Sequence, residues 1–362
     1  MSAAVPAAAL SVAIGERRRK GRNVITASAI LLAAMAVLSL SVGATGVSLD
    51  VLPGVIADLL SGSGTDTARE RLILLEIRLP RTLLAMFVGT ALAISGAMMQ
   101  GLFRNPLADP GVIGVSAGAA LAAVCVIALG HGIAAPVVSL LGIYAVPIAA
   151  FLGGMAATMV LVGITARHGH ISVGTLLLAG IAIAALAQSL LGLIAFASDD
   201  RALRDLTLWT LGSLAGASWT KVLAIAPFGV LIVLLVPRLV RGLNGFLFGE
   251  AEAFHLGVEV EKTKRLVVVA TAACVGAAVA VAGIIGFLGI VVPHFVRLLT
   301  GPDHAYVLPA SALLGASLAL GADIAARIVV APAELPLGIV MAIIGAPVFL
   351  HLVLKRGIGG LG

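Results

Sequence analysis

The feature that most constrains this chain is a succession of long apolar segments that carry almost no charge. About 20 apolar residues are needed to cross a bilayer as a helix. Only 11% of the 362 residues are charged and 60% are hydrophobic, whereas soluble domains carry about 25% charged residues. This pattern excludes a soluble enzyme and predicts an all-α, polytopic membrane protein. Ten transmembrane helices are expected, at residues 24–47, 82–103, 112–130, 145–166, 172–197, 219–237, 264–283, 284–299, 307–326 and 335–354.

The N-terminal segment indicates how the chain is oriented. Residues 1–22 end in a basic cluster, and the apolar run that follows is too long for the core of a secretory signal. We therefore interpret 1–22 as a cytoplasmic segment, 23–356 as a single ten-helix transmembrane domain and 357–362 as a cytoplasmic tail. Ten spans place both termini on the cytoplasmic side. Span 284–299 is short and contains Pro293, and residues 203–218 fit either a re-entrant or an interfacial segment.

The distribution of basic residues supports this orientation. Cytoplasmic loops of membrane proteins are enriched in Lys and Arg, and fifteen of the 23 such residues fall on the inner side. The excess of positive charge therefore indicates contact with anionic lipid rather than with nucleic acid. Eight fall on the outer side and need another explanation: Arg69, Arg71, Arg78, Arg81, Arg201, Arg204, Lys221 and Arg327.

The sequence contains few of the motifs and charged residues that catalysis or ion coupling requires. The chain contains no Gly-Lys dipeptide and thus no Walker A loop, so any ATP hydrolysis must come from another subunit. Asp323 is the only acid expected within a span, and its spacing predicts an i,i+4 ion pair with Arg327. We therefore expect a non-enzymatic subunit without its own cofactor.

The seven histidines do not have the spacing of a metal site, and none is expected to bind a metal. His294, after Pro293, is the one expected within the bundle, as a structural residue; the others, His304 included, are placed in loops or at membrane edges.

Two inner loops have distinctive sequences. Asn105, Pro106, Asp109 and Pro110 predict a rigid structural turn before the third span. Residues 249–260 predict a short amphipathic helix that ends at Gly257, with its apolar stripe formed by Ala251, Phe254 and Val258. Its acidic residues disfavour anionic lipid, so a groove on a partner protein is the preferred contact.

Several motifs resemble those of one known family. They are Arg78-Leu79-Pro80-Arg81, the run from Ser95 to Gln100 that leads into Asn105–Pro110, Gly286-Phe287-Leu288-Gly289, Val292-Pro293-His294, Glu334-Leu335-Pro336-Leu337-Gly338 and Gly345-Ala346-Pro347-Val348-Phe349. Together they resemble the permease subunits of type II ABC importers, the FecCD family, which imports iron-siderophores, haem and cobalamin.

The resemblance implies a homodimer in a bacterial inner membrane, two cytoplasmic ATPase subunits that hold ATP and Mg²⁺, and a periplasmic substrate-binding protein. It implies that Arg78, Arg81 and Arg327 contact acids on the binding protein. It also implies that the ATPase receives the segment containing Glu250, Ala251, Phe254, His255, Leu256 and Gly257.

The substrate is less constrained by the sequence. The stretch from Asp109 to Gly118 resembles that of haem permeases, although cobalamin permeases share its Pro-Gly pair. Haem is therefore the expected substrate, with an iron-siderophore or cobalamin as alternatives on the same machinery. An ion-coupled secondary transporter is a more distant alternative.

Overall fold

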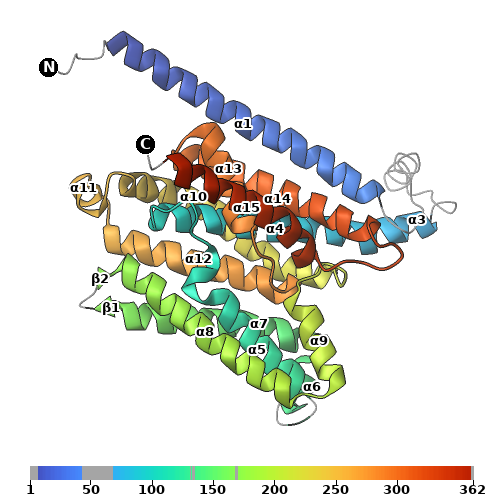
Figure 1. Ribbon diagram of the computed structural model, residues 1–362. Helices are drawn as coiled ribbons and strands as arrows, with labels where there is room; N and C mark the ends of the chain where they lie inside the picture. Colours follow the sequence, from blue (N-terminus) through green and yellow to red (C-terminus); the bar gives the residue numbers. More distant parts are fainter. Residues whose placement is uncertain (1–6, 43–67, 131, 133–134, 168–169, 360–362) are drawn as a thin grey trace.

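The molecule is a bundle of apolar helices that cross from one end of the structure to the other (Figure 1). The computed structural model describes residues 7–42, 68–130, 132, 135–167 and 170–359. Seven helices have the length and apolar composition to cross a membrane, and three shorter apolar helices accompany them in these ranges. Each of the ten predicted spans overlaps one of these helices, so the predicted fold class is confirmed. The last residues of the first predicted span, 43–47, lie outside the described ranges.

The first half of the bundle comprises α1 (Ala7–Ser41), α4 (Leu79–Leu102), α5 (Val115–Leu129), α7 (Ala145–Thr165) and α8 (Val173–Ala197). Shorter elements connect them: α3 (Ala68–Leu72), the π-helix η1 (Ile73–Arg78), the 3₁₀ turns η2 (Pro110–Ile113) and η3 (Gly142–Tyr144), α6 (Ala135–Leu141), and the strands β1 (Ala166–Arg167) and β2 (His170–Ile171). The two strands form a small antiparallel hairpin, with Ala166 opposite Ile171.

The second half comprises α10 (Trp219–Phe246), α12 (Val260–Ala282), α13 (Leu288–Thr300), α14 (His304–Ile328) and α15 (Leu337–Gly359), with the short helices α9 (Asp200–Thr210) and α11 (Glu250–His255) between them. In Figure 1, α11 and the β1–β2 hairpin lie at one end of the bundle, and α3 and α9 lie at the other. We call these the α11 end and the α9 end.

Helices α4 and α12 form the centre of the bundle. In their most apolar windows 78% and 83% of the residues are buried, against 17% for α1 and 11% for α8. Small residues make this close packing possible, because they let helix backbones approach in lipid. A Cβ atom on Gly89 would meet the carbonyl of Gly315 on α14, and one on Gly96 would meet that of Gly289 on α13.

Two predicted boundaries differ from the structure. The helix of the eighth span begins at Leu288 and not at residue 284. Gly283 and Phe287 both have positive φ angles (72° and 67°), which interrupt helical geometry. The non-helical stretch packs on residues 211–213, where the Ser213 N–H donates to the Ala282 carbonyl at 2.8 Å. Residues 200–210 form the amphipathic helix α9, in which only Leu206 is buried. This helix favours the interfacial interpretation of residues 203–218.

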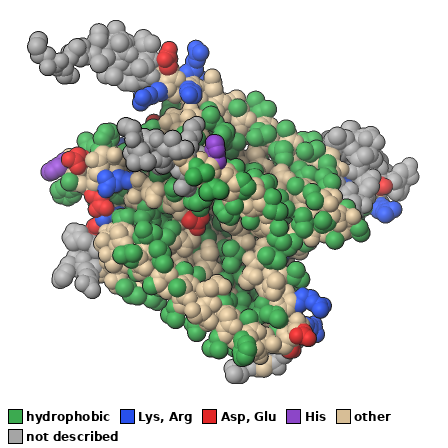
Figure 2. Space-filling view, in the orientation of Figure 1, with side chains coloured by type: hydrophobic (Ala, Val, Ile, Leu, Met, Phe, Trp, Pro, Cys, Tyr) green, Lys and Arg blue, Asp and Glu red, His purple; other side chains and the backbone are tan. Residues whose placement is uncertain are grey.

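The described charged side chains gather mostly near the ends of the bundle, and hydrophobic side chains cover most of the face between them (Figure 2). Water can solvate charge at the two ends, whereas the apolar belt matches a bilayer interior.

Candidate functional site

A cluster of charged side chains joins α4, α14 and the segment before α15 at the α9 end. The Nε of Arg81 donates to the two oxygens of Asp323 at 3.0 and 3.2 Å, and its Nη2 donates to Oδ1 at 2.9 Å. The two Nη groups also reach the two oxygens of Glu334, at 2.9 and 3.0 Å. Arg81 thus forms two-pronged contacts with both carboxylates, the geometry in which an arginine-carboxylate pair is strongest. Asp323 is 1% exposed.

The other two arginines of this cluster stabilise the end of α1. The Nη1 of Arg327 donates to the carbonyl of Val42 at 2.8 Å, and its Nη2 donates to the Ser39 hydroxyl at 3.1 Å. Arg78 donates to the carbonyl of Leu40. The last carbonyls of a helix lack partners within the helix and carry partial negative charge, so cations are favourable there.

The predicted pair of Asp323 and Arg327 is confirmed, with 3.1 Å between the carboxylate Oδ2 and Nε. Sequence reasoning missed Arg81 as the main partner of Asp323, and it gave Glu334 only as part of a motif, without its pairing to Arg81. We named Arg78, Arg81 and Arg327 as residues that meet another protein, but the structure buries all three, at 3%, 9% and 8% exposure. Their docking role remains a prediction.

The predicted short helix at the opposite end is present as α11, between Gly249 and Gly257. Both glycines have positive φ angles, 115° and 80°, which L-residues with a side chain rarely adopt. The predicted apolar stripe is wrong in part. The helix is anchored by Ala253, which is buried, and by Val258 after it, which contacts Gly245. The side chains predicted to contact a partner are all exposed: Glu250, Ala251, Phe254, His255, Leu256 and Gly257.

Lys264 connects α11 to the β1–β2 hairpin. Its side chain is 3% exposed, and its ammonium group contacts Glu250 Oε2 at 2.7 Å, the Ile171 carbonyl at 2.9 Å and Glu261 Oε1 at 3.2 Å. Since an ammonium group has three donors, all are used. The Ile171 N–H donates in turn to Glu261 Oε2 at 2.9 Å. One buried lysine therefore joins the β1–β2 hairpin between α7 and α8, the start of α12 and the segment 249–260 that contains α11.

The turn between α4 and α5 has the structural role that its sequence predicts. The side chain of Asn105 accepts from the N–H of Leu107 at 3.0 Å. The side chain of Asp109 caps η2 by accepting from the N–H of Gly111 at 2.7 Å. Burial raises the pKa of the Asp109 carboxyl, and the Gly111 hydrogen bond acts against this change. Pro106 is half-buried, and Pro110 is buried against Gly289.

His304 is a correction to the sequence interpretation. We placed it in an inner loop, but it is the first residue of α14 and is fully buried. Arg297 Nη2 lies 3.1 Å from its Nε2, and Asn244 Oδ1 lies 2.8 Å from its Nδ1. Because a guanidinium can only donate, Nε2 accepts and Nδ1 carries the proton. His294 is also buried within the bundle, as predicted.

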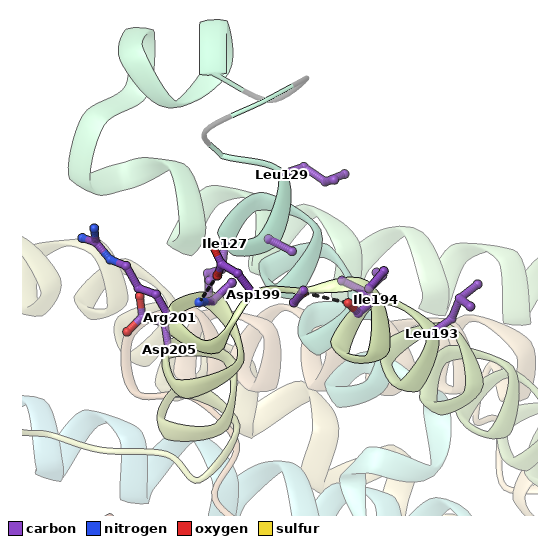
Figure 3. Close-up of a pocket in the computed structure, with 11 residues that line it drawn as sticks. Ile127, Leu129, Leu193, Ile194, Asp199, Arg201 and Asp205 are labelled. Carbon is purple, nitrogen blue, oxygen red and sulfur yellow. Dashed lines mark hydrogen bonds between the residues drawn. The ribbon is translucent and has the colours of Figure 1, made fainter.

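A hollow of about 460 Å³ opens between α5, α8 and α9 at the α9 end (Figure 3). Its wall is apolar on the side of Leu193 and Ile194 and polar where Asp199, Arg201 and Asp205 lie along α9 and its N-cap. Asp199 accepts from the N–H of Ala202 at 2.7 Å and so begins the helix. Within the described ranges, no group of three or more His, Cys, Asp and Glu side chains is arranged to hold a metal ion.

Comparison with known proteins identifies the family. The model of the FecCD transport family matches residues 30–355. The hemin transport system permease HmuU of Yersinia pestis is 45% identical over 284 residues, covering 78% of this chain and 84% of that protein. The vitamin B12 import permease BtuC of Escherichia coli O6:K15:H31 is 39% identical over 351 residues, covering 96% and 99%.

A solved ABC transporter described as of the metal-chelate type, in an inward-facing conformation, superimposes with a TM-score of 0.80. It is 31% identical and covers 92% of this chain and 99% of that one. The chain therefore belongs to the FecCD transport family and is a multi-pass permease subunit of an ABC importer.

Proposed function

We propose that this permease imports haem, with energy from partner ATPase subunits and substrate from a periplasmic binding protein. The observation that carries the proposal is the 45% identity to the hemin permease, against 39% for the cobalamin permease described above. An iron-siderophore or cobalamin is the alternative cargo, because cobalamin permeases match a larger share of the chain. The expected location is the bacterial inner membrane, with both termini cytoplasmic.

The exposed side of residues 249–260, which we call the coupling segment, supports docking of an ATPase. Phe254 and Leu256 are 70% and 66% exposed, and Phe248 just before α11 is 70% exposed. Exposed apolar side chains rimmed by polar residues mark interaction sites. The ATPase would hold ATP and Mg²⁺, and Lys264 would pass its movement to the β1–β2 hairpin. This assignment places the α11 end in the cytoplasm.

The surface of α8 supports a homodimer with a central pathway. Gln188 and Ser189 are exposed although they lie well inside this apolar helix. A polar side chain in contact with lipid is costly, so such residues usually face protein or water. We therefore place this face of α8 against a second copy or along the substrate pathway.

The charged cluster at the α9 end supports electrostatic attraction of an acidic partner. Among the residues that the structure describes, it contains three arginines and two carboxylates. Reversing the charge of Arg81 would place a glutamate beside Asp323 and Glu334, which would endanger folding. Arg78→Gln is the cleaner substitution, and Arg201→Gln is a matched control, because Arg201 is exposed at the same end.

Transport in proteoliposomes tests the cargo. We expect the permease, reconstituted with its ATPase and binding protein, to accumulate hemin only with ATP and to be inhibited by vanadate. Accumulation of cyanocobalamin or a ferric siderophore without hemin would refute haem as cargo. Hemin uptake driven by an ion gradient, without the ATPase, would refute the ABC mechanism.

Binding-protein affinity for the reconstituted permease tests docking. Arg78→Gln should weaken this affinity severalfold while lowering the thermal midpoint of the permease only slightly. Arg201→Gln should change the affinity little. Equal affinities for Arg78→Gln and the unmodified chain would remove Arg78 from the docking surface.

A further inference from the structure

A basic hollow lies at the α11 end, between α1 and the α13–α14 pair. Its volume is about 600 Å³, and Arg17, Arg18 and Lys20 of α1 line one side of it. Phe248, which precedes α11, lines it as well and fixes its place at this end. All three basic side chains are exposed, and within the described part of the chain none of them forms an ion pair with a carboxylate.

One carboxylate, that of Asp303, also lines the hollow. Its Oδ1 already accepts from Asn244 Nδ2 at 2.8 Å and from the Ala305 N–H at 2.9 Å. Three cations therefore face one acid that has other hydrogen-bond partners. The hollow has the charge to attract an anion.

Helix α1 lies in fixed register along α14. A Cβ atom on Gly21 would meet the ring of Tyr306, and one on Gly321 would lie 3.2 Å from Met35 Cε. The two helices thus run parallel, over fourteen residues of α1 and fifteen of α14. Figure 1 shows α1 lying lengthwise over this part of the bundle. Tyr306 lines the basic hollow, so the hollow opens where the two helices first touch.

A second, apolar groove of about 300 Å³ follows the same seam. Leu31 and Met35 of α1 line it together with Phe295 of α13 and Leu314 and Leu318 of α14. Leu31 is ten residues beyond Gly21, which is about 15 Å along a helix. Half of a bilayer's apolar core is also about 15 Å thick. The groove therefore lies one leaflet's depth from the basic hollow.

We propose that the α1–α13–α14 seam binds an anionic phospholipid. The phosphate lies among Arg17, Arg18 and Lys20, and one acyl chain lies in the groove beside Leu31 and Leu318. Phosphate is the anion that clustered basic side chains at a membrane surface attract. The apolar groove below explains why the ligand is a lipid rather than a free anion, since inorganic phosphate has nothing to place there.

Lipid binding to the full-length permease tests the proposal. Delipidated protein in detergent micelles is titrated with dioleoyl phosphatidylglycerol, and bound lipid is counted by mass spectrometry of the intact complex. The triple substitution Arg17→Gln, Arg18→Gln and Lys20→Gln should weaken binding roughly 100-fold, because each basic residue contributes about a factor of five at an anionic surface. The matched control replaces Arg238, Arg241 and Lys262, which are exposed, with glutamine.

The comparison ligands separate the sources of affinity. Dioleoyl phosphatidylethanolamine should bind much more weakly than phosphatidylglycerol, and so should inorganic phosphate and dihexanoyl phosphatidylglycerol. Leu318→Trp, which fills the groove, should weaken the dioleoyl lipid about 10-fold and leave the dihexanoyl lipid unchanged. Equal losses in the two triple variants, or binding of inorganic phosphate as tight as that of the lipid, would overturn the proposal. The proposal would also be overturned if the Arg17, Arg18 and Lys20 variant bound the lipid as tightly as the unmodified chain but bound the ATPase more weakly.

Discussion

Replacing Asp323 with asparagine should destabilise the permease more than any other conservative change in the charged cluster. The substitution keeps the shape of the side chain but removes its charge, which leaves Glu334 as the carboxylate that contacts Arg81 among the described residues. Removing one partner of a buried ion pair costs about 3–5 kcal/mol. Glu334 still neutralises Arg81, so we expect a loss near 3 kcal/mol in the free energy of unfolding.

Glu334→Gln is the matched comparison for this prediction. The side chain of Glu334 is 37% exposed, and pairs that reach solvent contribute about 0–1 kcal/mol. Its loss should therefore stay near 1 kcal/mol. Combining Asp323→Asn with Arg81→Gln should give a coupling energy of at least about 1 kcal/mol, since the two side chains are in direct contact.

Unfolding in mixed micelles, titrated with SDS and followed by tryptophan fluorescence, measures these differences. Trp219 is a suitable probe, because its indole N–H donates to the Leu75 carbonyl at 3.0 Å near the same end of the bundle. A loss below about 1 kcal/mol for Asp323→Asn, or one no larger than for Glu334→Gln, would refute the view that Asp323 is the main counter-charge of Arg81.

Two further predictions concern the helix packing and the coupling segment. Gly96→Ala should lower the free energy of unfolding by about 1–3 kcal/mol, because its methyl group would overlap the Gly289 carbonyl. The thermal midpoint measures this loss. Gly163→Ala is the control, since nothing lies within 4 Å of a Cβ atom at that position. Lys264→Met should lower the amount of substrate moved per ATP hydrolysed, because it removes the buried contact with Glu250. Lys262→Met should leave this ratio unchanged, because the side chains of Lys262 and its partner Glu259 are 77% and 67% exposed.

The spans could be predicted from the sequence because hydropathy alone decides which segments enter a bilayer. The interruption between α12 and α13 could not. The run 284–293 is apolar throughout, and the backbone leaves helical geometry at Gly283 and Phe287, where it packs on Gly212. Non-helical backbone at membrane depth is tolerated when protein surrounds it. Only the tertiary contacts show that protein surrounds this non-helical backbone.

The candidate site was predictable only where the partners are neighbours along a helix. Asp323 and Arg327 are four residues apart, so their pairing follows from helical geometry. Arg81 and Asp323 are 242 residues apart, and no local pattern links them. His304 follows the loop-like sequence Gly301-Pro302-Asp303. Its backbone N–H donates to Asn244 Oδ1 on a different helix, a contact that no local pattern predicts.

The placement of charge within the described helices indicates how a permease of this type changes state. Arg81 and Lys264 lie within two turns of the starts of α4 and α12, and Arg297 and Asp323 lie within two turns of the ends of α13 and α14. Each is tied to at least one other element rather than isolated in the apolar belt. A titrating relay would need such groups at intervals across the membrane. Charges held at the helix ends instead suit movement of whole helices against one another.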